Sequence, residues 1–100
     1  MHMHTVTIGG KDYILRCDMN VVEQVEEKLG SIEEAKRKSG SANVLKFLVT
    51  AMINEHFNFV GSPERVTENF VGASMMVSDR IPAMSAVVAC FAESFESKNV

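Results

Sequence analysis

Residues 44–56 read V-L-K-F-L-V-T-A-M-I-N-E-H, and this stretch decides the fold. Placed on a helix, its apolar side chains cover nearly the whole circumference, which is typical of a helix that is buried on most of its sides. Ser41 and Asn43 are both residue types that start helices, and either can cap this one. We therefore predict a central helix over residues 43–56, on which the other elements pack.

A β-hairpin is predicted on the N-terminal side, over residues 4–16. Residues 4–8 alternate polar and apolar side chains, and residues 13–16 are again rich in aromatic and β-branched types. Gly9 and Gly10 supply the positive φ angles that a tight hairpin turn requires. The side chains expected to face the interior are Val6, Ile8, Tyr13 and Leu15. Because two strands alone are marginally stable in water, this hairpin has to lie on helices or pair with another chain.

Two helices are expected between the hairpin and the central helix. Asp18 caps a helix over residues 19–29, and Gly30 ends it in the usual C-terminal position. Residues 31–34, Ser-Ile-Glu-Glu, match the capping-box pattern and open a short charged helix over residues 32–38. The apolar stripe of the first helix consists of Val21, Val22, Val25 and Leu29. This helix therefore buries one face and exposes the other.

Two further helices are predicted after the central one. Residues 62–64, Ser-Pro-Glu, are a helix-start signal with proline in the first turn, and they open a helix over residues 63–72. Residues 78–79, Ser-Asp, cap a last helix over residues 80–95, whose first turn tolerates Pro82. Its apolar residues recur at 3-4-3-4 spacing and form a seam: Ile81, Met84, Val88, Phe91 and Phe95. Val87 and Cys90 widen this seam. We expect this seam inside, since each buried apolar side chain contributes about 1.5–3 kcal/mol.

Length and composition indicate one domain with its own core. The chain has 100 residues, of which 46 % are apolar, and no repeat or long linker divides it. We predict a single α+β domain over residues 1–100, an N-terminal hairpin packed on a bundle of four to five helices. The chain has no apolar stretch of the ~20 residues that span a bilayer, and its N-terminus has no signal-peptide pattern. Cys17 and Cys90 do not make a disulfide framework, so we expect a cytoplasmic protein with reduced thiols.

The charge pattern argues against nucleic acid as a partner. Ten basic residues stand against 13 acidic ones, whereas a nucleic-acid binder needs a basic face for phosphate contacts. One basic cluster, residues 36–38, follows two glutamates at helical spacing. We therefore expect Glu33–Arg37 and Glu34–Lys38 pairs on a solvated helix face.

Candidate residues for chemistry do not combine into a site. His56 has no second histidine four residues away, so the metalloprotease pattern fails. His2 and His4 supply two ligands where structural zinc takes four. Cys90 lies on an apolar helix and is expected to be a core residue. We predict no catalytic residue, no metal and no cofactor, and retain a hydrolase or regulator that uses His56 and Cys17 as a third alternative.

Two apolar connections are candidates for partner binding. Met75, Met76 and Val77 lie between predicted helices, and methionine is frequent at adaptable binding surfaces. Phe57 and Phe59 lie in the other such connection. Each segment either covers the core or contacts a partner, and both interpretations stay open. If the two segments share one face, that patch is the best candidate for a partner site.

Three segments resemble, in this order, the tail assembly chaperones of long-tailed phages. They are VTIGGKDYILR (6–16), VEEKLGSIEE (25–34) and FLVTAMINE (47–55). In that family a hairpin with a Gly-Lys turn and a tyrosine leads into a helix that closes on Leu/Phe-Gly-Ser and a capping box. The resemblance covers about residues 1–60 well and the remainder in helix order and length, and the apolar connection 75–77 departs from it.

The resemblance implies a non-enzymatic role. Proteins of this family are small and acidic, are encoded just before the tape-measure protein, and keep that protein soluble while tail-tube subunits assemble around it. Some members are also made in a longer form by ribosomal frameshifting. We accordingly expect a homo-oligomeric phage or prophage tail assembly chaperone in the host cytoplasm, with the tape-measure protein and the tail tube protein as partners. The alternative is a small structural phage protein, either a head–tail connector or a tail component, that acts as an oligomeric interaction module.

Overall fold

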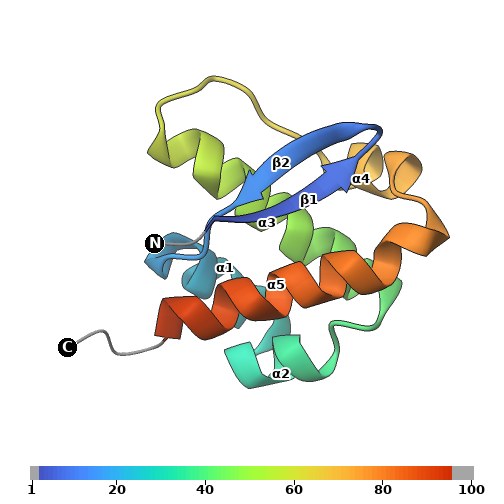
Figure 1. Cartoon of the computed structure of the whole chain (residues 1–100). Helices are drawn as coiled ribbons and strands as arrows, with labels where there is room; N and C mark the ends of the chain where they lie inside the picture. Colours follow the sequence, from blue (N-terminus) through green and yellow to red (C-terminus); the bar gives the residue numbers. More distant parts are fainter. Residues whose placement is uncertain (1–2, 96–100) are drawn as a thin grey trace.

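The computed structural model describes residues 3–95, and over this range the chain forms a two-stranded hairpin and five α-helices (Figure 1). The elements are β1 (His4–Ile8), β2 (Lys11–Leu15), α1 (Met19–Leu29), α2 (Ile32–Arg37), α3 (Ala42–Phe59), α4 (Glu68–Ser74), the 3₁₀ turn η1 (Val77–Asp79) and α5 (Arg80–Phe95). This arrangement confirms the α+β class. His2, considered above as a metal ligand, lies outside the described residues.

The hairpin has the predicted turn and the predicted inward face. β1 and β2 are antiparallel, with Val6 opposite Tyr13. Gly9 and Gly10 have φ angles of 61° and 81°, and positive φ at both central residues is the mark of a type I′ turn. The four side chains expected inside are all buried. β1 packs on α5 and β2 on α3, so the hairpin lies across both helices (Figure 1).

Side-chain caps begin α1 and α2 at the predicted residues, although the capping box of α2 is only half formed, since the Glu34 carboxylate pairs with Arg37 and Lys38. The Asp18 carboxylate accepts hydrogen bonds from the backbone N–H groups of Asn20 and Val21, at 3.1 and 3.3 Å. Ser31 Oγ accepts one from the N–H of Glu34 at 3.1 Å, and Gly30, with φ 96°, closes α1. These local bonds explain why both helices begin where the sequence indicates.

The ion pairs on α2 differ partly from expectation. Lys38 Nζ lies 3.6 Å from Glu34, as predicted. Arg37, however, pairs with Glu34, three residues away, and not with Glu33. Glu34 thus pairs with both Arg37 and Lys38, because residues three and four positions apart lie on one side of a helix.

α3 is the centre of the fold, as its composition predicts. Ten of its residues are buried, and it packs against β2, α1, α4 and α5. The helix continues to Phe59, three residues beyond the expected end at His56. Phe57 packs edge-to-face on Tyr13, with ring centroids 6.4 Å apart, and the next residue with positive φ after the start of α3 is Gly61 (78°). The helix therefore continues until the chain can turn.

The prediction for the start of α4 is wrong. No helix begins at Ser62-Pro63-Glu64; α4 begins at Glu68, with the Thr67 hydroxyl accepting from the N–H of Phe70 at 3.0 Å. The Asn54 side chain on α3 donates to the carbonyl of Val66 at 2.9 Å and accepts from its N–H at 2.8 Å. This pair of bonds uses the backbone groups that a helix over 63–72 would need for itself.

The predicted seam of α5 is partly wrong, because the buried stripe is shifted toward Val87 and Cys90. The buried residues among 80–94 are Ala83, Val87, Cys90 and Phe91. Of these, Phe91 belongs to the 3-4-3-4 set, and Val87 and Cys90 are the residues expected to widen the seam. Ile81 is 66 % exposed and Val88 is 37 % exposed, while Met84 is half-buried; the side chain of Phe95 lies outside the described part. Ala83 and Cys90 are small, and facing them inward lets the helix axis approach β1 and α3 closely.

Candidate interaction surface

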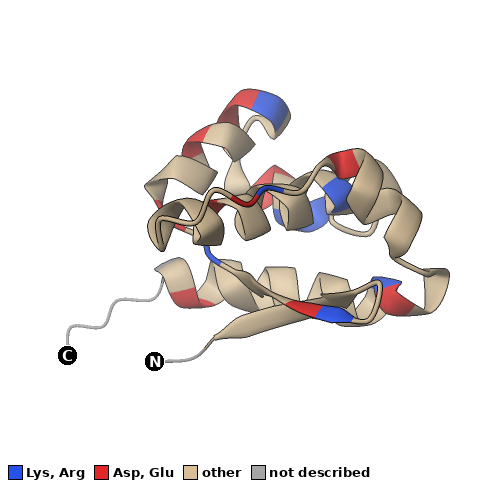
Figure 2. Cartoon of the chain, turned by 90° about the horizontal axis from the view of Figure 1, so that it is seen from above, with Lys and Arg blue, Asp and Glu red and all other residues tan. Residues whose placement is uncertain are grey.

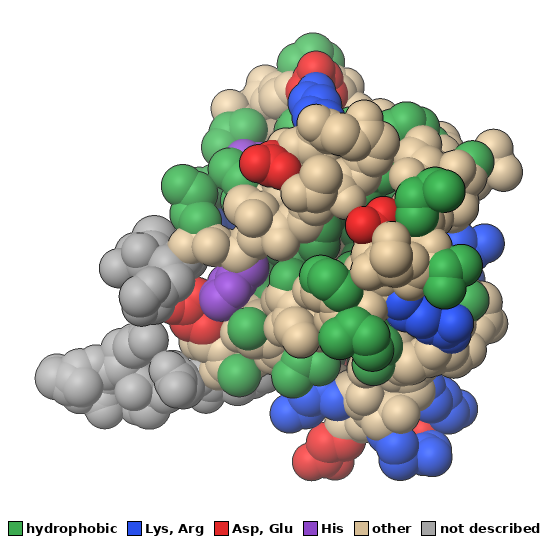
Figure 3. Space-filling model, turned by 45° about the vertical axis from the view of Figure 1, so that its right-hand side comes forward, with side chains coloured by type: hydrophobic (Ala, Val, Ile, Leu, Met, Phe, Trp, Pro, Cys, Tyr) green, Lys and Arg blue, Asp and Glu red, His purple; other side chains and the backbone are tan. Residues whose placement is uncertain are grey.

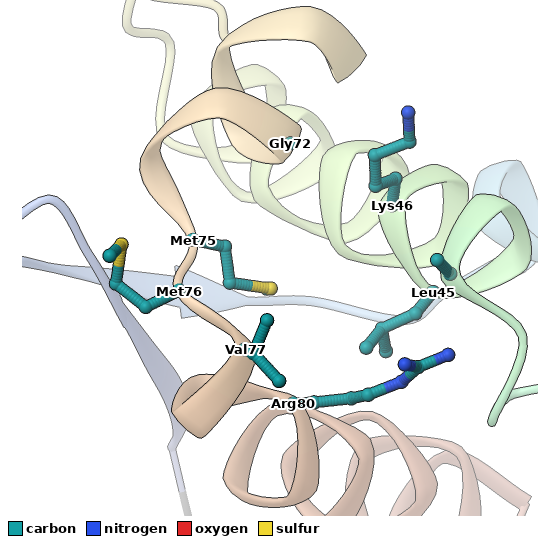
Figure 4. A pocket seen from close by; sticks show the side chains of 8 residues that line it. Leu45, Lys46, Gly72, Met75, Met76, Val77 and Arg80 are labelled. Carbon is teal, nitrogen blue, oxygen red and sulfur yellow. The ribbon is translucent and has the colours of Figure 1, made fainter.

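A hollow of about 150 Å³ lies where the connection between α4 and α5 crosses the first turns of α3 (Figure 4). It lies on the side of the molecule where Figure 3 shows a group of hydrophobic side chains next to lysine and arginine side chains. The lining residues come from three segments: Ala42, Leu45 and Lys46 of α3, Gly72 of α4, and Met75, Met76, Val77 and Arg80 of the connection and α5. The site is therefore assembled from parts of the chain that are distant in sequence.

The three predicted residues of the α4–α5 connection have different roles. Met75 points into the hollow and packs on the core, whereas Met76 points away from the hollow (Figure 4). Met76 and Val77 are 66 % and 86 % exposed. The backbone is held by Asp79, whose carboxylate accepts from the N–H of Met76 at 2.8 Å, while the N–H of Asp79 donates to the Met76 carbonyl at 2.9 Å. Met75 thus covers the core, and its two neighbours are free to contact a partner.

Two cations border the apolar hollow. The aliphatic part of Lys46 lies over Gly72, where a Cβ atom would come within 2.7 Å of Lys46 Cδ. The Arg80 guanidinium donates to the carbonyl of Gly40 at 2.5 Å. Within residues 3–94 neither cation forms an ion pair with a carboxylate. The hollow therefore combines an apolar lining with positive charge.

Phe57 and Phe59 lie at the other end of α3. Phe57 is half-buried against the core, while Phe59 is 62 % exposed with the Arg16 guanidinium carbon 3.5 Å from its ring centroid. Leu45 at the hollow and Phe57 are separated by about 18 Å along the helix axis, at 1.5 Å per residue. The two apolar segments therefore do not form one patch, and of the predicted partner-binding residues only Met75, Met76 and Val77 line the hollow.

Sequence reasoning did not identify the residues that complete the hollow. The sequence pattern places Leu45 in the core and gives no role to Lys46, which is the only charged residue between positions 44 and 53. A single cation in an otherwise apolar helix was the available signal. Arg80 gave no such signal, since its position beside the hollow depends on how α5 packs. Figure 2 shows that charged residues on α5 occur only near its two ends.

A carboxyl pair joins the start of α1 to α3. Glu55 is buried and accepts from the side-chain amides of Asn20 at 3.0 Å and Asn58 at 3.5 Å. Burial raises the pKa of Glu55, and its hydrogen bond with Asp18 raises the pKa further. Burial alone would raise the pKa of Asp18. Hydrogen bonds from Glu55 and Arg16 outweigh this effect and hold the pKa of Asp18 below its ordinary value. Of the two carboxyls, Glu55 therefore keeps its proton to higher pH, and in the protonated form it can donate to Asp18.

Replacing Glu55 by glutamine is expected to stabilise the protein at pH values at which the Glu55 carboxyl is ionised. A raised pKa in the folded state means that the contribution of Glu55 to stability is present at acid pH and is lost as the pH rises through that pKa. Glutamine keeps both the acceptor for Asn20 and the donor to Asp18 without ionising. We expect a melting temperature about 2–5 °C higher than that of the wild type at pH 8, with the difference shrinking toward pH 4.5.

Thermal melts by circular dichroism at pH 4.5, 6 and 8 measure this effect, with Glu23→Gln on the exposed face of α1 as the control. The Asp18 carboxyl titrates below its ordinary value of 3.8, so it does not contribute in this range. An E55Q difference that stays constant from pH 4.5 to 8 would contradict a raised pKa at this position.

Cys17, Cys90, His4 and His56 do not line the hollow. The Ser94 hydroxyl oxygen is 2.8 Å from the carbonyl oxygens of both Cys17 and Cys90. Burial raises the pKa of Cys17, and it raises the pKa of Cys90 to about 12. His4 Nε2 lies 2.8 Å from Glu93 Oε1 on α5. Among the described residues no hydrogen bond links His56 to Cys17, and no three His, Cys, Asp or Glu side chains are grouped to hold a metal ion.

Alkylation by iodoacetamide at pH 8 is expected to be slow at both thiols. Because the thiolate is the reactive form, Cys90 should react about a thousandfold or more slowly than free cysteine until the chain unfolds. The single variants Cys17→Ala and Cys90→Ala allow each rate to be followed by intact mass, and urea-unfolded protein supplies the reference. Labelling of Cys17 faster than free cysteine would indicate an activated thiolate and would revive the hydrolase alternative.

Within residues 3–95 no single helix is long and apolar enough to span a membrane. α4 and residues 77–94 meet both criteria when they are taken together, but a bend of 105° separates them. Comparisons of this chain with protein-family models, with curated proteins and with solved structures found no match.

Proposed function

We propose that this chain is a non-enzymatic tail assembly chaperone of a phage or prophage, which binds the tape-measure protein and tail subunits while the tail assembles. One observation of the structure carries the proposal. Met76 and Val77 are exposed beside an apolar hollow, on a turn that hydrogen bonds to Asp79 keep in place. The resemblance of residues 6–55 to the chaperone family supplies the class of partner.

The physical properties of this surface suit an assembly chaperone. Isolated exposed apolar residues are ordinary on proteins, but a group of them beside a hollow favours binding. A long helical client presents apolar side chains at intervals of three and four residues, and such side chains fit hydrophobic grooves. Methionine side chains adapt to different contacts, so one surface can engage many similar segments of a client.

The remaining features fit the same proposal. The hairpin consists of two strands only, and an unpaired outer strand edge can add a strand from a second copy, in keeping with a homo-oligomer. The chain carries a net charge of −3, which suits a protein that works among other proteins of the host cytoplasm without binding nucleic acid.

The proposal is tested by recovering the tagged chain from cells that produce the tail proteins. We expect the tape-measure protein to co-purify, identified by mass, and to become insoluble when this chain is withheld. The control is the same pull-down from cells that lack the tail genes. Recovery of the chain in stoichiometric amounts from finished particles would instead favour the structural alternative, since an assembly chaperone is absent from completed tails.

A further inference from the structure

The charges around the hollow have one sign although the chain is acidic overall. Lys46 and Arg80 are the charged residues of the lining, which contains no aspartate or glutamate. The nearest acidic residue in sequence, Asp79, directs its carboxylate to the N–H of Met76. In a chain with 13 acidic and 10 basic residues, this apolar site therefore has a rim that is only positive.

Neighbouring residues of the same chain keep both cations at the rim. Lys46 passes over Gly72, where a Cβ atom would lie 2.7 Å from Lys46 Cδ, so the glycine lets the lysine stem lie in this position. The hydrogen bond from Arg80 to the Gly40 carbonyl uses one edge of the guanidinium and leaves other N–H donors free. Neither cation is neutralised by a carboxylate within residues 3–94. Such cations are available to an acidic group that approaches the hollow.

The size of the hollow limits what enters it. About 150 Å³ is the volume of a protein cavity that accepts a benzene-sized group, whereas pockets for drug-sized ligands are usually larger than ~300 Å³. One leucine, methionine or phenylalanine side chain matches this size. On a helix, residues four positions before and after such a side chain lie on the same face.

We propose that the hollow binds one apolar side chain of a partner helix and that Lys46 and Arg80 select helices with carboxylates one turn away from it. The occupant is thus an acidic amphipathic helical segment of another protein. This inference deepens the proposed function, on which it rests, by stating the chemistry of the client segment. Charge pairs at an exposed rim mainly set selectivity, and added salt weakens them.

The test uses the full chain and three synthetic helical peptides of equal length. The first has a leucine flanked by glutamates four positions before and after it, the second replaces the glutamates by lysines, and the third replaces the leucine by alanine. Methyl NMR spectra report on Leu45, Met75 and Val77 during titration. We expect the acidic peptide to shift these methyl signals and to bind at least about tenfold more tightly than either of the others.

Charge reversal supplies the second arm of the test. The double variant Lys46→Glu with Arg80→Glu should prefer the lysine peptide, and Lys36→Glu, an exposed cation on α2 away from the hollow, should keep the wild-type preference. If the charge-reversed variant does not fold, the neutral double variant Lys46→Gln with Arg80→Gln replaces it. This neutral variant should bind the acidic and basic peptides equally.

Several results would overturn the inference. They are equal binding of the acidic and basic peptides by the wild type, no shift up to about 1 mM peptide, or shifts that lie away from the hollow. Shifts of the same methyl signals on raising the protein concentration without peptide would show a second copy in the hollow, which also overturns it. The pull-down reports on the chaperone role separately: loss of peptide selectivity with the tape-measure protein still bound refutes this inference alone.

Discussion

Replacing Phe91 by alanine is expected to lower the free energy of unfolding by about 3–5 kcal/mol, whereas Ile81→Ala should lower it by less than about 0.5 kcal/mol. Both residues belong to the apolar 3-4-3-4 pattern of α5, but the structure places them on different sides. Phe91 is fully buried, and its loss leaves a cavity in the core. Ile81 is 66 % exposed, so a smaller side chain there leaves no cavity.

Urea unfolding followed by circular dichroism measures both changes. A domain of this size has a total stability of about 5–15 kcal/mol, so the alanine variant at position 91 can be largely unfolded. Phe91→Leu, which keeps most of the volume, then supplies a milder loss, and Val88→Ala supplies a second exposed control. A cost at position 81 equal to that at position 91 would show that α5 packs in the phase that the sequence pattern predicts, and would contradict the structure.

Replacing Met76 and Val77 together by serine is expected to reduce the recovery of the tape-measure protein at least about tenfold, which corresponds to about 1.4 kcal/mol of binding. Both side chains are mostly exposed, so their removal takes apolar contact area from a partner but little from the core. The melting temperature should therefore change by no more than about 2 °C. Pull-down yield and thermal melting on the same protein preparation measure the two effects.

Met19→Ser is the matched control for this variant. Met19 is 77 % exposed on α1, and the hollow does not include it. The control should bind the tape-measure protein as the wild type does. Equal binding by the double serine variant and the wild type would remove the α4–α5 connection from the client surface. Loss of binding by Met19→Ser as well would place the contact elsewhere or spread it over the whole molecule.

The hairpin, α1 and the start of α2 were determined by sequence alone. Their signals are local: Gly9 and Gly10 provide the turn, Asp18 and Ser31 provide caps, and Gly30 ends α1. Such interactions form between residues that are close in the chain, so they depend little on the rest of the fold. The apolar composition of α3 likewise determined its place in the core, because a helix apolar all round has to be covered on all sides.

The α4 boundary, the phase of α5 and the hollow were decided only by the tertiary structure. Asn54 holds the backbone of Val66, and this contact overrides a helix-start signal at Pro63. On α5 two apolar stripes compete, and contact with β1 and α3 selects the one with small residues. Lys46 and Arg80 meet at one hollow because α3 and α5 pack side by side. Contacts between residues far apart in the chain leave no local pattern, and for that reason the sequence located the methionine segment but not the charged rim of its site.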